Sequence, residues 1–121
     1  MKIVSEHYFR LNYTFFKSGN QYFIANLQEE VQGKIVKWIS LLQEYGPTLK
    51  RPYADKLRDK IYELRLSFGK LEIRILYFFW NSSIILTNGF LKKTRSVPES
   101  EIEKAINYMN DFIKRNGGGE K

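Results

Sequence analysis

The sequence contains no cysteine and only one histidine, His7, in 121 residues. The lack of cysteine excludes disulfide bonds and thiolate metal ligands. A single histidine excludes a metal site built from several histidines and a catalytic pair of cysteine and histidine. No two acidic residues share the apolar setting that suits general acid and base chemistry. We therefore expect no metal and no other cofactor.

Long apolar runs are also missing. The longest run is Ile75–Trp80, whereas a helix that spans a membrane needs about 20 apolar residues. The first residues, "MKIVSEHYFRLNY", lack the continuous apolar core of a signal peptide. We therefore expect a soluble, cytoplasmic protein without a membrane partner.

Positive charge is concentrated in the middle of the sequence. The segment Pro47–Arg95 contains eleven Lys and Arg against four Asp and Glu, which accounts for the whole net charge of +7. The remaining residues have nine bases and nine acids and are neutral. Such an excess within one small domain favours an anionic partner, most often a nucleic acid.

The N-terminal half predicts one strand and then helix. His7–Phe16 is rich in aromatic and β-favouring residues, and a turn signal follows it. Apolar residues recur every three or four positions over Tyr22–Tyr45, which predicts an amphipathic helix. We expect Gly33 to be a possible break into two helices and Gly46 to end the helical segment. The polar, aperiodic stretch Thr48–Lys60 predicts a loop.

The C-terminal half predicts a meander and a last helix. Ile61–Ser67 and Leu71–Trp80 alternate between two faces, and Ile84–Leu91 gives a third strand after a short turn. Pro98 and the acids after it mark a helix start, and an apolar stripe continues to Arg115.

These elements predict an α+β fold, in which helices pack on one face of a small, twisted, mostly antiparallel sheet. We assign residues 1–116 to a single domain and residues 117–121 to a flexible Gly-rich tail.

The charges on the first hairpin have a purely structural interpretation. If "SFGK" forms the turn, Glu63 lies opposite Arg74 and Arg65 lies opposite Glu72. Two cross-strand ion pairs on a solvated face would then explain all four residues, at a few tenths of a kcal/mol for each pair.

A functional interpretation rests on the position of the basic side chains, which come together on one face of neighbouring strands. Arg65 and Arg74 share one face, and Lys93 leaves the next strand in phase with them, whereas Lys92 points away unless the strand twists or bulges. Trp80 adds an aromatic group to this face. Cations and aromatic rings together suit RNA, which offers phosphates and unstacked bases. The candidate RNA-binding residues are Lys56, Arg58, Arg95 and Trp80.

Five short motifs resemble a known family. "ISLLQEYGP", "PYADKL", "YELRL", "EIRILYFF" and "LTNGFLKKTRSVPESEIEKAI" are similar, in this order, to phage-derived HigB-like toxins of the RelE superfamily, over Val31–Lys114. The resemblance implies an endoribonuclease that cuts messenger RNA, usually on the ribosome. It also implies a partner, a HigA-like antitoxin with a helix-turn-helix fold.

The resemblance also implies the catalytic residues. Arg74 falls at the family's phosphate-binding arginine, Arg65 at a basic strand position, and Lys92 and Lys93 at the basic pair after the last strand. The implied reaction is attack by the 2′-hydroxyl of the RNA on the adjacent phosphate, which yields a 2′,3′-cyclic phosphate and a free 5′-hydroxyl. Cations that stabilise the phosphate oxygens allow this reaction without a metal.

One position departs from the family pattern. Some relatives have Tyr or His after the basic pair, but Thr94, Arg95 and Ser96 stand here. The group that protonates the leaving oxygen is therefore open between a lysine of lowered pKa, Glu63 and Tyr77. The residues alone also allow a non-catalytic nucleic-acid-binding module, or a structural phage protein whose basic patch meets an acidic partner.

Overall fold

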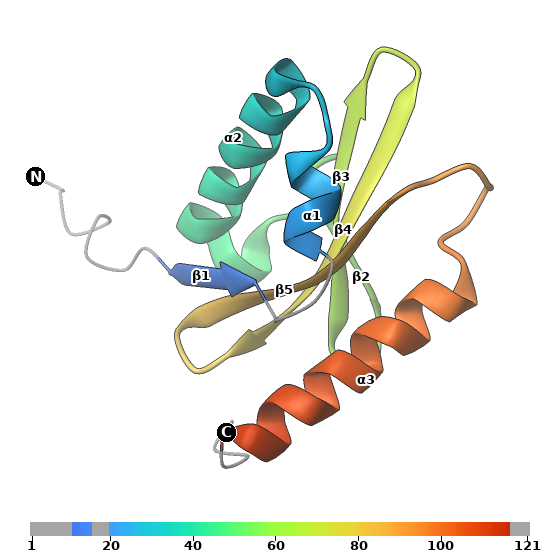
Figure 1. The fold of residues 1–121 in the computed structure, drawn as a ribbon. Coiled ribbons are helices and arrows are strands. Elements are labelled where there is room, and N and C mark those ends of the chain that lie inside the picture. Colours follow the sequence, from blue (N-terminus) through green and yellow to red (C-terminus); the bar gives the residue numbers. More distant parts are fainter. Residues whose placement is uncertain (1–10, 16–19, 117–121) are drawn as a thin grey trace, which may run out of the picture.

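The computed structural model describes residues 11–15 and 20–116, and Figure 1 shows how their helices and strands are arranged. The strands are β1 (Asn12–Phe15), β2 (Ala54–Arg58), β3 (Ile61–Phe68), β4 (Leu71–Trp80) and β5 (Ser83–Leu91). The helices are α1 (Asn20–Ala25), α2 (Glu29–Tyr45), the short 3-10 helix η2 (Gly46–Thr48) and α3 (Glu99–Arg115). His7, much of the expected first strand and the tail 117–121 lie outside the described residues.

The described strands form one mixed sheet in the order β1-β5-β4-β3-β2. β1 runs parallel to β5, and the other neighbouring strands are antiparallel. The predicted α+β fold with a mostly antiparallel sheet is therefore confirmed. β1 and β2 form the two opposite edges of the sheet.

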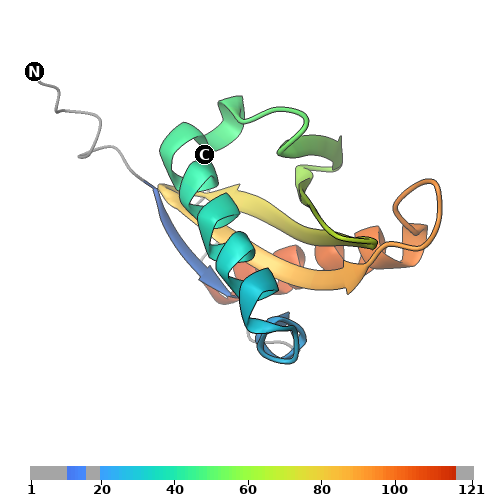
Figure 2. The same ribbon diagram turned by 90° about the horizontal axis from the view of Figure 1, so that it is seen from above.

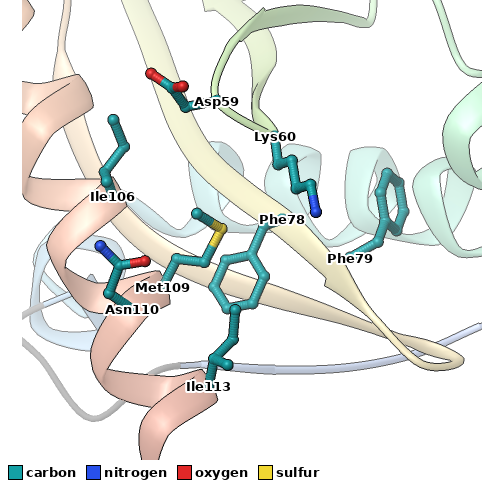
Figure 3. A pocket seen from close by; sticks show the side chains of 8 residues that line it. All are labelled: Asp59, Lys60, Phe78, Phe79, Ile106, Met109, Asn110 and Ile113. Atoms are coloured by element: carbon teal, nitrogen blue, oxygen red, sulfur yellow. The ribbon is translucent and has the colours of Figure 1, made fainter. Parts of the chain in front are cut away.

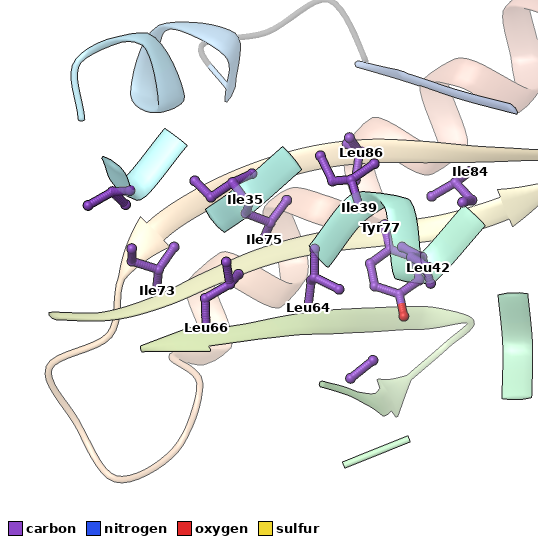
Figure 4. Close-up of a cluster of buried hydrophobic side chains, with 12 residues drawn as sticks. Ile35, Ile39, Leu42, Leu64, Leu66, Ile73, Ile75, Tyr77, Ile84 and Leu86 are labelled. Carbon is purple, nitrogen blue, oxygen red and sulfur yellow. The ribbon is translucent and has the colours of Figure 1, made fainter. Parts of the chain in front are cut away.

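The helices α1 and α2 cover one face of the sheet. The apolar residues of α2 recur with helical spacing, so that they point together at alternate residues of the strands. Figure 4 shows this core between α2 and the sheet. Its buried helix residues are Val31, Ile35, Ile39 and Leu42, and its buried residues in the three central strands are Leu64, Leu66, Ile73, Ile75, Tyr77, Ile84 and Leu86.

Helix α3 adds a second layer, on the opposite face. Ala105 and Met109 pack there against Leu76, Phe78 and Ile85, which alternate with the residues that face α2. Figure 2 shows α2 and α3 on the two sides of the sheet. The helices were expected to pack on one face of the sheet, and α1 and α2 do so. Because α3 packs on the other face, the central strand β4 is apolar on both faces.

The predicted helical segment Tyr22–Tyr45 is interrupted, but not at Gly33, where a break was expected as a possibility. The interruption lies at residues 26–28, between α1 and α2, and Gly33 lies inside α2 on its exposed side. Glycine is tolerated in a helix interior at a cost of about 1 kcal/mol, so Gly33 need not end it. Gly46 ends α2 as expected, with a φ of +55° and its N–H bonded to the carbonyl of Leu42.

The predicted loop over Thr48–Lys60 is wrong in its second half, because Ala54–Arg58 forms β2. Among the described strands β2 lies at an edge and pairs with β3 alone, and its register shifts between Lys56 and Arg58. A short edge strand with a bulge buries few side chains, so its sequence shows little apolar alternation.

The hairpin between β3 and β4 has a tighter turn than expected. Phe68 lies opposite Leu71, so that only Gly69 and residue 70 connect the strands. Gly69 has a φ of +61°, as tight hairpin turns often require of glycine. Arg65 therefore lies opposite Arg74, so the expected register is wrong, although Arg74 still forms an ion pair with Glu63 diagonally across the two strands.

Candidate nucleic-acid interface

A cationic pocket of about 230 Å³ lies where β2 and β3 approach the loop that follows β5. Four basic and two acidic side chains are among its lining residues. These lining residues are Arg51, Asp55, Leu57, Glu63, Arg65, Lys92, Arg95, Ser96 and Val97. We call this cavity the phosphate pocket. Its excess of cations gives it the charge that an RNA phosphate requires.

Glu63 forms the centre of an ionic cluster beneath the phosphate pocket. Its Oε2 accepts a hydrogen bond from Nη1 of Arg65 at 2.7 Å, and its Oε1 lies 3.2 Å from Nε of Arg74. The second contact is an ion pair without hydrogen-bond alignment, since neither of these two atoms has a hydrogen-bond partner. One carboxylate therefore holds two guanidinium groups.

Arg74 is buried, which corrects the expectation of a solvated face. Its exposed fraction is 4% and that of Glu63 is 2%. The Arg74 Nη1 donates to the carbonyl of Ile73 at 3.0 Å. Arg65 is the outer member of the cluster, with 23% of its side chain exposed at the pocket.

Glu72 is a second acidic partner of Arg74. Its Oε1 lies 3.4 Å from Arg74 Nη1, and its Oε2 accepts a hydrogen bond from the hydroxyl of Ser67 at 2.7 Å. The hydrogen bond from the Ser67 hydroxyl, followed by the hydrogen bond and the charge of Arg74, holds the pKa of Glu72 below its usual value of 4.5. The expected pair of Arg65 with Glu72 is not among the described contacts.

A bulge in β5 changes which side chains of this strand face the cluster. Ile75 lies opposite Gly89, but Tyr77 lies opposite Leu86, so β5 contains one extra residue between them. The hydroxyl of Thr87 in this bulge donates to the carbonyl of Leu76 at 3.1 Å. Side chains after the bulge therefore lie on the face opposite to the one that simple alternation predicts.

The bulge reverses the expected roles of the two lysines. Phe90 lies opposite Arg74, and Leu91 packs into the core under α2. Continued alternation places Lys92 on the side of Arg74, and Lys92 indeed lines the phosphate pocket. Lys93 is exposed and is not among the lining residues. The expectation that Lys93 rather than Lys92 lies in phase with Arg74 is wrong.

Lys92 also organises the loop after β5. Its Nζ donates to the carbonyl of Thr94 at 2.7 Å and to that of Arg95 at 2.9 Å. Its backbone N–H donates to the carbonyl of Glu72 at 2.7 Å. These bonds fold the loop back on itself and place Arg95, whose side chain is exposed, beside the pocket.

Two of the candidate RNA-binding residues lie elsewhere. Lys56 lies over the ring of Tyr62, with 6.0 Å between Nζ and the ring centroid, and Tyr62 belongs to the face under α2. Arg58 forms ion pairs with Asp59 and with Glu99 in the first turn of α3. The structure therefore brings neither residue into the phosphate pocket.

The two aromatic candidates belong to the apolar layers. Trp80 packs edge-on against Phe112 of α3, with 5.2 Å between the rings, and lies six residues along β4 from Arg74, or about 20 Å. Tyr77 is buried under α2, and burial raises the pKa of its hydroxyl. A buried phenol on the opposite face has no path to a phosphate in this pocket.

A larger cavity of about 420 Å³ lies between α3 and the sheet and is shown in Figure 3. Its walls are mainly apolar, and Asp59 and Lys60 at its rim carry opposite charges. Phe78 and Met109 within it belong to the core under α3. This cavity lacks the cationic excess of the phosphate pocket.

Sequence reasoning did not single out Arg51 and Asp55. Arg51 Nε donates to Asp55 Oδ2 at 2.8 Å, and both side chains line the phosphate pocket. Their contribution depends on β2, which brings Asp55 opposite Glu63. The only signal in the sequence was their position within the basic segment.

The described residues include no group of three or more His, Cys, Asp and Glu placed to share a metal ion. None of the described helices has both the length and the apolar character needed to cross a bilayer.

The fold and the pocket define a small basic α+β domain that is compatible with the RelE-like fold. The chain belongs to the family of phage-derived Gp49-like proteins, whose family model matches residues 22–110. This family is of the RelE/HigB-like toxin type. No curated protein matches the chain in a sequence comparison.

Proposed function

We propose that this protein is the toxin of a type II toxin–antitoxin system and acts as an endoribonuclease on messenger RNA. The observation that carries the proposal is the phosphate pocket, which gathers Arg51, Arg65, Lys92 and Arg95 at one end of the sheet in a member of a toxin-type family. The HigB-like assignment, the dependence on ribosomes and the cytoplasmic location belong to this proposal.

The proposed reaction is a transfer within the RNA. The 2′-hydroxyl gives up its proton while its oxygen attacks the adjacent phosphorus. The bond from phosphorus to the 5′-oxygen breaks, and this oxygen takes up a proton from solvent, so that the products carry a 2′,3′-cyclic phosphate and a 5′-hydroxyl. Negative charge grows on the non-bridging oxygens in the transition state. Fixed cations that stabilise this charge lower the barrier, because they need no reorganisation during the reaction.

In this proposal Arg65 and Arg95 bind the reacting phosphate. Arg65 is preorganised, since Glu63 fixes its guanidinium group while part of the side chain stays open to the pocket. Arg74 is too deeply buried to meet the phosphate in this conformation and acts through Glu63 as a positioning residue. Lys92 holds the loop of Arg95 and adds its own charge to the pocket wall.

The remaining basic residues have outer roles. Lys93 is exposed beside the pocket and would contact the RNA backbone away from the reacting phosphate.

Proton transfer needs an accessible group, and Asp55 is the more exposed of the two carboxylates in the pocket. We assign removal of the 2′-hydroxyl proton to Asp55 rather than to Glu63, which two guanidinium groups already hold.

The partners follow from the proposed activity. Messenger RNA on the ribosome is the substrate, and a HigA-like helix-turn-helix antitoxin is the inhibitor. The basic segment between Pro47 and Arg95 gives an acidic antitoxin surface an electrostatic partner.

Transcript-end mapping tests the proposal. Purified protein is incubated with a messenger RNA in the presence and in the absence of ribosomes, and the ends of the products are analysed. We expect cleavage with ribosomes and products that carry 5′-hydroxyl and 2′,3′-cyclic phosphate ends. RNA binding without cleavage would instead establish a non-catalytic nucleic-acid-binding module, and failure to bind or cut RNA would favour a structural phage protein.

A further inference from the structure

A further cavity, of about 300 Å³, lies beside the phosphate pocket, and we call it the second cavity. It is formed by the end of α2, by η2 and by the segment that leads into β2. Its lining residues are Leu41, Tyr45, Thr48, Leu49, Lys50, Arg51 and Tyr53. The lining includes two cations and two aromatic rings but no acidic residue.

The two cavities share Arg51, which is a lining residue of both. The Arg51 Nε is bonded to Asp55 on the side of the phosphate pocket. Asp55 is the hydrogen-bond and ion-pair partner of the Arg51 side chain within the described part of the chain, and most of this side chain is exposed. A chain of phosphates can therefore contact Arg51 while it passes from one cavity to the other.

The aromatic rings of the second cavity are open to solvent but held in place. Tyr45 is 50% exposed and Tyr53 is 37% exposed. The ring of Tyr53 packs against Trp38, with 5.4 Å between centroids. The hydroxyl of Thr48 donates to the carbonyl of Tyr45 at 2.6 Å and fixes the backbone there.

We propose that this second cavity is a base-binding subsite for the nucleotide next to the phosphate in the phosphate pocket. The ligand class is a nucleobase of single-stranded RNA, stacked on Tyr45 or Tyr53, with Lys50 and Arg51 on its phosphates. Exposed aromatic rings beside a cationic groove are the arrangement that binds single strands without strict sequence preference. The volume is at the lower end for ligand pockets, which suits one nucleoside.

This inference rests on the proposed function, because that function supplies the phosphate from which the RNA extends. Its test uses a short oligonucleotide with 2′-O-methyl groups, which cannot undergo the proposed reaction. The fluorescent base 2-aminopurine is placed at each position in turn, since stacking on an aromatic ring quenches its emission. Affinity is measured by anisotropy on the same samples.

We expect the wild type to quench 2-aminopurine at one position of the oligonucleotide. Tyr45→Ala should remove much of this quenching and weaken binding about tenfold, because stacking on one ring makes a contribution of this order. Tyr45→Phe should retain both properties. If Tyr53→Ala folds, it should lose quenching and affinity as Tyr45→Ala does. If it does not fold, Tyr45→Ala alone tests the subsite. Tyr13→Ala is the control, because Tyr13 is an exposed tyrosine on β1, at the opposite edge of the sheet.

The result that overturns the subsite is unchanged quenching and affinity in folded Tyr45→Ala. The cleavage assay separates this failure from that of the proposed function. If the protein cuts RNA on ribosomes while the tyrosine variants keep wild-type quenching and affinity, the proposed nuclease activity stands and the proposed subsite is wrong. Quenching that depends on Tyr45, in a wild type that never cuts RNA, would retain the subsite and remove the nuclease.

Discussion

Arg74 Nε lies 3.2 Å from Glu63 Oε1, and both side chains are buried between β3, β4 and the layer that contains α3. Burial of two charges carries a large desolvation cost, which their attraction offsets only while both are present. Glu63 also fixes Arg65, so the buried pair supports a residue at the pocket surface. The stability of the sheet and the geometry of the pocket are therefore coupled through one carboxylate.

The first prediction concerns the buried pair. Arg74→Ala should lower the free energy of unfolding by roughly 3 kcal/mol, at the lower end of the range for broken buried pairs because Arg65 still neutralises Glu63. Urea denaturation measures this change. Arg115→Ala is a matched control, since its pair with Asp111 is exposed and should contribute no more than about 0.5 kcal/mol.

A double variant distinguishes charge burial from simple loss of packing. Glu63→Leu combined with Arg74→Met replaces both charges by apolar groups of similar size, so it should be more stable than Arg74→Ala alone. Equal or greater destabilisation of the double variant would contradict the electrostatic explanation.

The second prediction concerns pH. A carboxyl whose pKa is lowered in the folded state stabilises the protein above its unfolded pKa, and this stabilisation is lost as pH falls through the folded pKa. Glu72, whose pKa lies below 4.5, should therefore contribute to stability at neutral pH and lose this contribution at pH values below 4.5. Urea denaturation at several pH values should show a smaller acid loss in Glu72→Gln than in the wild type.

The hydroxyl of Ser67 is the largest cause of this lowered pKa. Ser67→Ala should therefore raise the pKa of Glu72 in an NMR titration of its carboxyl carbon. Ser100→Ala removes an exposed serine in the first turn of α3 and serves as the control. An unchanged titration of Glu72 in Ser67→Ala would assign the shift to Arg74 instead.

The third prediction separates packing from RNA binding at Trp80. Its ring contacts Phe112, so Trp80→Ala and Phe112→Ala should each destabilise the protein by roughly 2–4 kcal/mol, slightly below the usual range because both side chains are partly exposed. Affinity for the uncleavable oligonucleotide should stay within twofold of the wild type, at a temperature where the variants are folded. A large loss of affinity in folded Trp80→Ala would restore its expected place among the RNA-binding residues.

The sequence predicted the elements with regular apolar spacing. The strand pattern of Leu71–Trp80 matches β4, the two neighbouring strand patterns match β3 and β5 to within one residue, and the apolar stripe after Pro98 matches α3. It did not predict β2, because an edge strand that buries one side weakly has little alternation to detect. The apolar periodicity of a sequence thus reflects which side chains are buried, and an edge strand buries few of them.

The site was harder to predict because it depends on register. A two-residue turn at Gly69 places Arg65 opposite Arg74, and one extra residue in β5 exchanges the faces of Lys92 and Lys93. Neither a turn length nor a bulge leaves a periodic trace in the sequence. Burial of Arg74 was equally hidden, since the exposure of a strand residue depends on what packs over its face of the sheet in the folded chain.

The fourth prediction tests the proposed phosphate contact. Arg65→Ala should reduce the rate of cleavage by about 10²–10³, the usual effect of removing one fixed donor from a transition state. Stability should change less than in Arg74→Ala, because Arg65 is the more exposed member of the cluster. Arg65→Lys retains the charge but not the two-pronged geometry, and we expect intermediate activity. Wild-type rates in folded Arg65→Ala would remove this residue from the reaction.

The last prediction compares the two lysines after β5. Lys92 lines the phosphate pocket, and its Nζ holds the carbonyls of Thr94 and Arg95, whereas Lys93 points to solvent outside it. Lys92→Ala should therefore reduce cleavage strongly, both by removing a charge and by releasing the loop that positions Arg95. Lys93→Ala should mainly raise KM, with a weaker dependence of RNA binding on salt, as expected for an outer backbone contact.

Rates and RNA affinities of the two single variants, measured over a series of salt concentrations, check this order. Melting temperatures distinguish a local effect from loss of the fold, and amide hydrogen exchange at residues 94–96 should increase in Lys92→Ala alone. If Lys93→Ala loses kcat while Lys92→Ala retains it, the loop after β5 must rearrange when RNA binds. The bulge in β5 would then not determine which lysine reaches the phosphate.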